Sequence, residues 1–309
     1  MIGNILSTTQ QVVVLAILML VGFVCGKVHL FDDDSIACLS SFALRVVGPS
    51  AIIYSFCRPF DAEKFRAILM VVLIGFCFYV VSVILAFLLI RGGKDSTRRV
   101  LRYGTVFANC GYMGMPLQQA LYGADGLFYA ASWQIIYNLV AWTFGLFLMS
   151  GNKKEISFGK LIKNPGIIAV GTGMIIFVCS IGVPQILLQP IGYLANLNVP
   201  IPMVICGYYL SKADLHTIWR HPNYYMTILL RLIVLPLIFI GLLMLTDLND
   251  MMLVCCIVNI APPVAAATTM FSVLYKQDSE TAANLVSIST LLSIITLPVM
   301  IALAQSVFS

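Results

Sequence analysis

The chain has 309 residues, of which 60% are hydrophobic and only 10% are charged, and its mean hydropathy is +0.98. Soluble domains carry about 25% charged residues, so this composition excludes a soluble fold. The net charge of +5 does not indicate a nucleic-acid surface, because the basic residues lie in short loops between apolar runs, where they set membrane topology. The sequence therefore predicts an all-α polytopic membrane protein within a lipid bilayer.

Ten apolar segments are long enough to cross a bilayer, which takes about 20 residues per helix. The uncharged run from residue 164 to residue 211 is too long for one span, and Val183-Pro184-Gln185 with Gln189-Pro190 predict the turn that divides it. Residues 1–26 carry no charge and so lack a basic signal-peptide region, and we expect the first span to remain in the mature protein. The predicted spans are 8–27, 35–57, 67–90, 101–122, 126–149, 164–183, 189–210, 222–246, 250–274 and 281–305.

Lysine and arginine residues predict the orientation of these spans. The loops after the odd-numbered spans hold thirteen of them, whereas the loops after the even-numbered spans hold three, Arg58, Lys64 and Arg66. Basic loops stay in the cytoplasm. We therefore expect a multi-pass protein of the plasma membrane with both termini extracellular.

The loop at 151–163 divides the chain into two halves of five spans each, residues 1–151 and 152–309. Five is an odd number, so two repeats of five spans must be inserted upside down relative to each other. The sequence thus predicts two inverted repeats.

The fourth span of each half carries helix breakers at its uncharged centre. One stretch is Asn109-Cys-Gly-Tyr-Met-Gly-Met-Pro116, with Gly111, Gly114 and Pro116, and the other is Asn259-Ile-Ala-Pro-Pro263, with the pair Pro262 and Pro263. Proline removes a backbone donor and crowds the preceding turn, and such breaks in a membrane are tolerated only where the freed groups face protein, water or a ligand. Interrupted helices in corresponding positions of two halves indicate the binding site of a transporter.

The chain resembles the auxin efflux carrier family, in its bacterial branch, at motifs spread over nearly its whole length. The matching residues are Asn109, Gly114 and Pro116; Lys163-Asn164-Pro165; Pro202 with Gly207; Arg231 with Pro236; Ala261-Pro262-Pro263; and Ser289-Thr-Leu-Leu-Ser293 followed by Thr296-Leu-Pro298. The resemblance implies that spans four and nine cross at their prolines. It also implies a scaffold of spans one, two, six and seven, a moving transport domain of spans three to five and eight to ten, and a homodimer through the scaffold helices.

Polar residues at and beside the breaks are the candidate substrate-binding residues. Asn109 and Asn259 are predicted either to bind substrate or to cap a half-helix. Tyr112 lies inside the first break and either touches substrate or packs in the core. Thr268 follows the second break, where a hydroxyl commonly bonds back to its own helix.

Gln134 and Asn138 in span five are four residues apart and share one helix face. Two amides on one face of an apolar span must find partners inside the bundle. They are predicted either to line the site or to join helices.

The remaining polar residues give little support to an enzyme. Arg45 and Arg231 lie deep in their spans and are secondary functional candidates. Asp32-Asp33-Asp34 could hold a magnesium-diphosphate, but the cluster is single, and a solvated loop is the expected reading. No HExxH, GxSxG or glycine-rich phosphate loop is present, so we expect no catalytic residue, metal or cofactor.

The predicted function is a secondary transporter of a small organic anion, a carboxylate above all, that works by elevator-like alternating access. The alternative is a cation/proton antiporter of the same crossed-helix plan. Cation exchange usually needs a carboxylate inside the membrane, and every Asp and Glu here falls in a loop or at a span end. The sequence therefore favours the anion.

Overall fold

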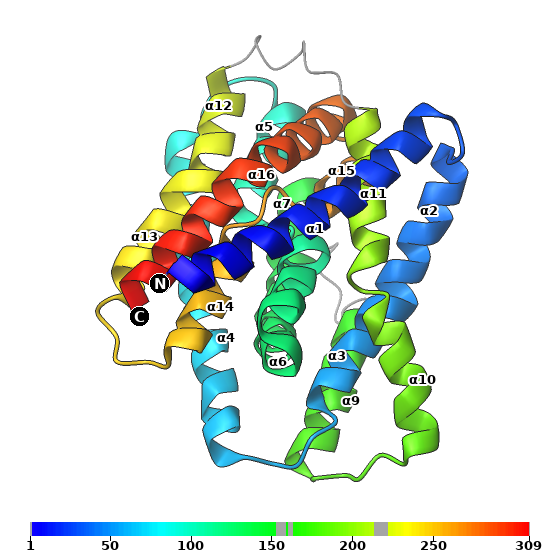
Figure 1. Cartoon of the computed structure of the whole chain (residues 1–309). Helices are drawn as coiled ribbons and strands as arrows, with labels where there is room; N and C mark the ends of the chain where they lie inside the picture. The colour runs from blue at the N-terminus through cyan, green and yellow to red at the C-terminus, as the bar shows by residue number, and fades with distance from the viewer. Residues whose placement is uncertain (1, 153–158, 160–162, 213–221, 309) are drawn as a thin grey trace.

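The computed structural model describes residues 2–152, 159, 163–212 and 222–308. Within these ranges the regular elements are all helices (Figure 1). In addition, Ala108 and Val264 form one isolated antiparallel β-bridge. Six stretches are long and apolar enough to cross a membrane: 33–56, 62–89, 110–150, 185–211, 223–243 and 279–308. Three further apolar helices are shorter, at 13–27, 165–178 and 250–260. The predicted all-α, multi-pass membrane protein is thus confirmed at this level.

The helices form two groups that are drawn from both halves of the sequence. In the first group α1 packs on α11, and α3 packs on α9 and α10. In Figure 1, α1 runs from the left side to the upper right, and the other helices of the group lie toward the right. Its members are α1 (Ile2–Lys27), α2 (Asp33–Phe42), α3 (Gly48–Phe56), α9 (Pro165–Val178), α10 (Gln185–Asn196) and α11 (Pro200–Ser211).

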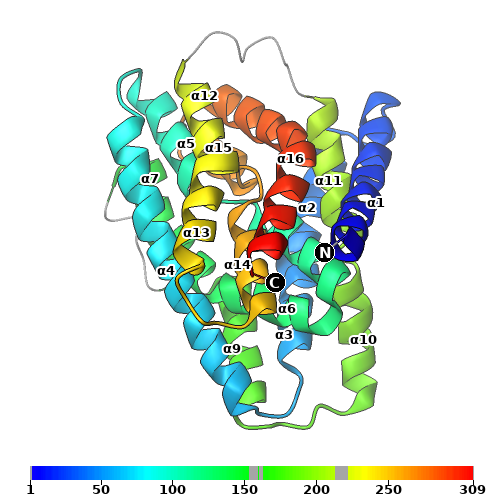
Figure 2. The same ribbon diagram turned by 60° about the vertical axis from the view of Figure 1, so that its left-hand side comes forward.

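The second group is built around α4, α6 and α14, which pack on one another, and α16, which packs on α14. Figure 2 shows α5, α12, α13 and α15 beside them. Its members are α4 (Ala62–Leu89), α5 (Asp95–Val106), α6 (Met115–Val140), α7 (Leu146–Ser150), α12 (Pro222–Leu229), α13 (Leu235–Leu243), α14 (Asp250–Ile260), α15 (Ala267–Leu274) and α16 (Ser279–Phe308). The α6 segment turns at Gly123, whose φ of 58° suits a residue without a side chain.

Widened π-helical turns recur where a proline follows. The turns η1 (Ala43–Val47), η2 (Cys110–Gly114) and η6 (Leu230–Val234) are each followed by a helix with proline at its second residue. Proline offers no N–H to the carbonyl four residues back and crowds the preceding turn, and a π-turn relieves both. The fourth turn, η3 (Ala141–Gly145), has no such proline, and there the Thr143 hydroxyl bonds the Leu139 carbonyl at 2.6 Å.

Glycines let α1 and α11 approach closely. A β-carbon on Gly207 would lie 1.8 Å from the Met19 carbonyl oxygen, and one on Gly22 would lie 2.0 Å from the Val204 carbonyl oxygen. Small residues at helix contacts are how membrane helices gain packing energy. The first group is therefore held by backbone-to-backbone contact.

Two sequence expectations about turns are wrong in part. The three aspartates at 32–34 are exposed, as expected, and Asp32 precedes α2 and caps it by accepting from the Ser35 N–H, but Asp33 and Asp34 lie in the first turn of that helix and not in a loop. Pro190 lies inside α10, and the turn after α9 ends at Pro184. Pro190 is the sixth of the twelve residues of α10, so it lies in the helix interior, where its missing N–H removes one hydrogen bond.

Candidate functional site

The two predicted breaks meet and hydrogen-bond to each other. The chain leaves helical form after Val106 at the end of α5 and after Ile260 at the end of α14. The Asn109 N–H donates to the Pro263 carbonyl at 2.8 Å, and the Ala265 N–H donates to the Phe107 carbonyl at 3.0 Å. Each break thus satisfies backbone groups that the other has freed, as an apolar interior demands.

Helix α16 and an aromatic cluster support the crossing. The Ser289 hydroxyl on α16 accepts from the Val264 N–H at 3.1 Å, so this serine holds the second break in place. The Phe107 ring stacks 4.3 Å from Tyr103 and 5.7 Å from Tyr79. Sequence reasoning used Ser289 only for the family resemblance, and its hydroxyl bond to the break was not foreseen.

The two asparagines occupy different positions relative to their breaks. Asn109 lies in the first break with its side chain 5% exposed, and its Nδ2 is 3.8 Å from the Cys206 Sγ of α11. Asn259 lies in the last turn of α14, where its Nδ2 donates to the Cys255 carbonyl at 3.1 Å and its buried Oδ1 has no partner. Neither side chain caps a half-helix, so the capping interpretation is wrong.

Glycine brings the first break close to α14. A β-carbon on Gly114 would lie 3.2 Å from the Val258 carbonyl oxygen and 3.3 Å from the Asn259 Oδ1. A β-carbon on Gly111 would lie 3.8 Å from the Gln134 Nε2. Gly114 therefore permits the close approach, and Gly111 leaves its backbone facing an amide.

The structure joins the polar residues of span five to different neighbours. The Gln134 Nε2 donates to the Cys110 Sγ at 3.6 Å, beside the first break. Asn138 donates to the Gln134 carbonyl at 2.8 Å and lies against Gly166 in the first turn of α9. Gln134 is thus part of the crossing region, whereas Asn138 contacts the first group of helices.

Tyr112 and the two prolines of the second break have structural contacts. The Tyr112 hydroxyl donates to the Ser40 carbonyl of α2 at 3.4 Å, across the two groups of helices. Pro262 and Pro263 fill the gap between α14 and α15, and Pro116 lies at the second residue of α6.

Two buried side chains near the breaks have polar atoms without hydrogen bonds. Thr268, at 0% exposure, has an unpartnered hydroxyl instead of the expected bond to its own helix. Gln118, at 0% exposure and one turn beyond the first break, has no partner for either amide atom. Such atoms are rare in protein interiors and call for a ligand, a water or a functional reason. Sequence reasoning missed Gln118, whose signal was a second amide directly after the break.

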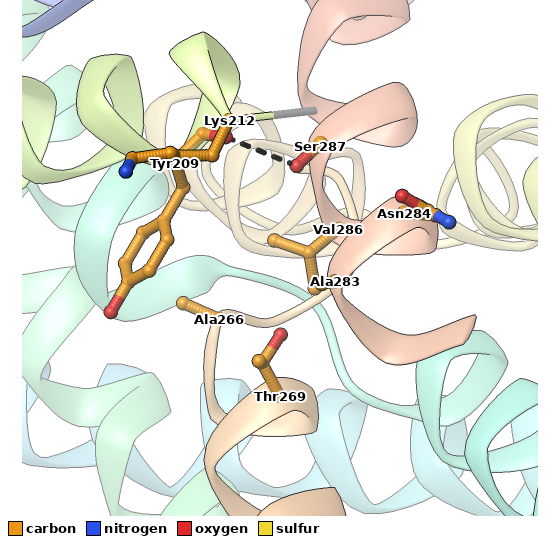
Figure 3. Close-up of a pocket in the computed structure, with 8 residues that line it drawn as sticks. All are labelled: Tyr209, Lys212, Ala266, Thr269, Ala283, Asn284, Val286 and Ser287. Atoms are coloured by element: carbon orange, nitrogen blue, oxygen red, sulfur yellow. Dashed lines mark hydrogen bonds between the residues drawn. The ribbon is translucent and has the colours of Figure 1, made fainter. Parts of the chain in front are cut away.

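A cavity of about 70 Å³ lies next to the second break, between α11, α15 and α16. Figure 3 shows the Thr269 hydroxyl directed toward it and the hydrogen bond from Ser287 to the Tyr209 carbonyl, of 3.4 Å, along its edge. Ala266, which also lines it, directly precedes α15. The cavity thus extends from the second break toward the end of the molecule where Lys212 lies.

Arg231 and Arg45 differ in environment. Arg231 is completely buried in η6, where its Nη1 donates to the Thr105 carbonyl at 3.2 Å and its Nη2 donates to the Ile260 carbonyl. Its guanidinium lies 5.2 Å from the centre of the Phe78 ring. Arg45 is exposed in η1. Of the two secondary candidates, Arg231 is therefore the one at the crossing.

The acidic residues in the described ranges lie away from the crossing. Each is in a loop, at the start of a helix, or beside the turn at Gly123. Asp125, at that turn, pairs with Arg58 at 2.7 Å and with Lys64 at 3.1 Å.

Comparisons with known proteins agree with this architecture. A family profile described as membrane transport protein matches residues 7–301. The chain is 23% identical over 301 residues to an uncharacterized transporter of Methanothermobacter thermautotrophicus, covering 95% of this chain and 97% of the relative. It is 24% identical over 304 residues to an uncharacterized transporter of Methanocaldococcus jannaschii, covering 92% and 94%.

Proposed function

Because the chain belongs to the membrane transport protein family, as its resemblance to the auxin efflux carriers predicted, we propose that it moves a small organic anion across the plasma membrane. The observation that carries the proposal is the pair of hydrogen-bonded breaks with Asn109, Gln134 and Thr268 around them. The helical segments that begin at Cys110 and Ala267 point their N-termini at the breaks. Helix N-termini carry partial positive charge and N–H donors, which suit a carboxylate.

Elevator-like alternating access is the mechanism we propose. The first group of helices would be the scaffold, and the second group would carry the substrate. Several hydrogen bonds between the groups are long, such as Asn109–Cys206 at 3.8 Å and Tyr112–Ser40 at 3.4 Å. Bonds of this length contribute little, because hydrogen bonds weaken beyond about 3.2 Å, so the second group could slide at low cost.

The same proposal includes ten spans in two inverted repeats, 1–151 and 152–309, with both termini outside and a homodimer through the scaffold. The loops after α1 and α4 lie at one end of the molecule and those after α3 and α9 at the other, as Figure 1 shows. This alternation is what spans of opposite direction require. The excess of lysine and arginine in the first set would place that end in the cytoplasm.

The anion is preferred over the cation of the alternative antiporter because the crossing holds Arg231 and no described carboxylate. A cation in hydrocarbon would need a negative ligand to balance its charge. Asp125, which directly precedes predicted span five, is already paired with Arg58 and Lys64.

Binding and uptake measurements test the proposed function. Purified protein is titrated with acetate, butyrate, benzoate and succinate in a thermal-shift assay, since a ligand that binds only the folded state raises its apparent stability. Radiolabelled forms of the stabilising carboxylates are then offered to proteoliposomes. We expect uptake that is unchanged when sodium is replaced by potassium or choline. Uptake that collapses without sodium, or stabilisation by cations alone, would contradict the proposal.

A further inference from the structure

Arg231 is a buried charge whose described partners are main-chain carbonyls. A buried ion is costly unless it is paired or well hydrogen-bonded, yet the ion pairs in the described ranges involve other basic residues, on the chain segments 58–64 and 95–99. Arg231 instead donates to Thr105 and Ile260, which lie in the last turns of α5 and α14. These carbonyls belong to the group of four that a helix end leaves without an internal partner.

The net charge at the crossing is the sum of the partial charges of the four helix termini that meet there and the charge of Arg231. Helices α5 and α14 both terminate there, and each C-terminus is equivalent to about −0.5 of an elementary charge. Arg231 contributes +1 and contacts both ends, so the negative ends are cancelled. The segments that begin at Cys110 and Ala267 contribute about +0.5 each, and no described acidic side chain lies beside them to offset this.

We propose that Arg231, by cancelling the two carbonyl ends, leaves the crossing with a net positive charge and thereby sets its selectivity for a monoanion. Without Arg231 the four half-helix ends would sum to about zero, and the site would have no preference for charge. Arg231 is thus a specificity-determining residue that acts through the helix ends. The inference rests on the proposed function of the crossing as the substrate site.

Arg102 provides a matched control because it makes the same kind of contact elsewhere. Its Nε and Nη2 donate to the Ile90 carbonyl at the end of α4, at 3.2 and 3.0 Å, and its guanidinium lies 4.2 Å from the Phe87 ring. Arg102 lies in α5, and its guanidinium contacts the C-terminal end of α4 and not the crossing. The variants to compare are Arg231→Gln, which removes the charge but keeps a donor, Arg231→Lys, which keeps the charge, and Arg102→Gln.

A first measurement needs no ligand. We expect Arg231→Gln to lower the melting temperature of the purified protein by several degrees more than Arg102→Gln does, because it leaves two buried carbonyl ends unbalanced. Arg231→Lys should recover part of that loss. Melting of Arg231→Gln at the wild-type temperature would overturn the cancellation of the helix ends, whatever the substrate is.

The second measurement separates charge selectivity from stability. Dissociation constants are measured below the melting range for acetate, butyrate, benzoate and succinate and for the matching neutral amides. We expect Arg231→Gln to weaken carboxylate binding about tenfold or more while leaving amide binding nearly unchanged, since only the charged ligand feels the lost cation. Arg231→Lys and Arg102→Gln should keep the wild-type ratio of carboxylate to amide affinity.

The outcomes distinguish the inference from the proposed function. Should wild-type protein bind none of the carboxylates, the proposed function fails, and the melting comparison alone judges the role of Arg231. Should wild-type protein bind them and Arg231→Gln keep the same carboxylate-to-amide ratio, the inference fails and the proposed function stands. If Arg231→Gln does not fold, Arg231→Lys alone tests the inference. A lower ratio of carboxylate to amide affinity in Arg231→Lys than in the wild type would then count against a purely electrostatic role, because lysine keeps the charge.

Discussion

Replacing Asn109 by alanine should weaken substrate binding with little loss of stability. The side chain makes one recorded contact, a 3.8 Å approach of its Nδ2 to the Cys206 Sγ, which is a weak hydrogen bond at best. The structural bond from its backbone N–H to Pro263 survives, and alanine accepts the φ of −78°. We therefore expect the free energy of unfolding to fall by less than about 1 kcal/mol.

The loss of transport should be larger than the loss of stability. A hydrogen bond to a charged ligand is worth about 1.5–3 kcal/mol, and about 1.4 kcal/mol corresponds to a tenfold change, so KM for carboxylate uptake should rise between about tenfold and a hundredfold. Asn249→Ala is the matched control, because Asn249 caps α14 at the far end from the crossing by accepting from the Met252 N–H. That variant should lose about 1 kcal/mol of stability with KM unchanged.

Asn109→Asp makes the test two-sided. A carboxylate at this buried position should repel an anionic substrate, so carboxylate uptake in proteoliposomes should fall below that of Asn109→Ala. A wild-type KM in Asn109→Ala at normal protein levels would refute the assignment of this amide to the site. The antiporter would be favoured by a different pair of results: wild-type protein takes up no carboxylate, and Asn109→Asp gains cation uptake.

Three further predictions concern the frame around the site. Pro116→Ala restores an N–H that can tighten η2 into an α-turn, so uptake should fall while surface expression stays normal; unchanged uptake would show that Pro116 does not shape the site. Gly207→Ala should lower the melting temperature strongly, because its β-carbon would lie 1.8 Å from a carbonyl oxygen of α1. Such overpacking costs about 1–3 kcal/mol of stability. The control is Gly171→Ala in α9, whose β-carbon would meet no atom within 4 Å and which should leave the melting temperature unchanged. In protein without its nine native cysteines, an impermeant maleimide on intact cells should label Glu63→Cys and spare Lys94→Cys, and the reverse pattern would invert the topology.

Local signals in the sequence predicted the breaks because helix breaking is a local property. Pro262 and Pro263 forbid a continuous helix wherever they lie, and the structure indeed ends α14 just before them. The length of the uncharged apolar runs likewise predicted the apolar helices. Pro190 shows the limit of the rule, since it lies inside α10 without ending that helix.

The partners of the polar groups could not be predicted, because they come from distant segments. Arg231 lies 126 residues from Thr105, and no local pattern joins them. The same two roles were predicted for Asn109 and Asn259, yet one lies in a break and the other in a helix. Pairing across the crossing instead joins Ala108 to Val264.

That bridge constrains the order in which the protein can be made. Residues 107–109 exchange hydrogen bonds with residues 263–265, so the first break cannot be completed until most of the chain has left the ribosome. Until then its open carbonyl and amide groups would stand in the bilayer, at several kcal/mol each. The newly made first half must therefore keep span four at the membrane surface, inside the insertion machinery, or as a temporary unbroken helix. We expect residues 1–151 expressed alone to be degraded, and co-expression of 152–309 to rescue them; a stable, monodisperse first half on its own would disprove this order.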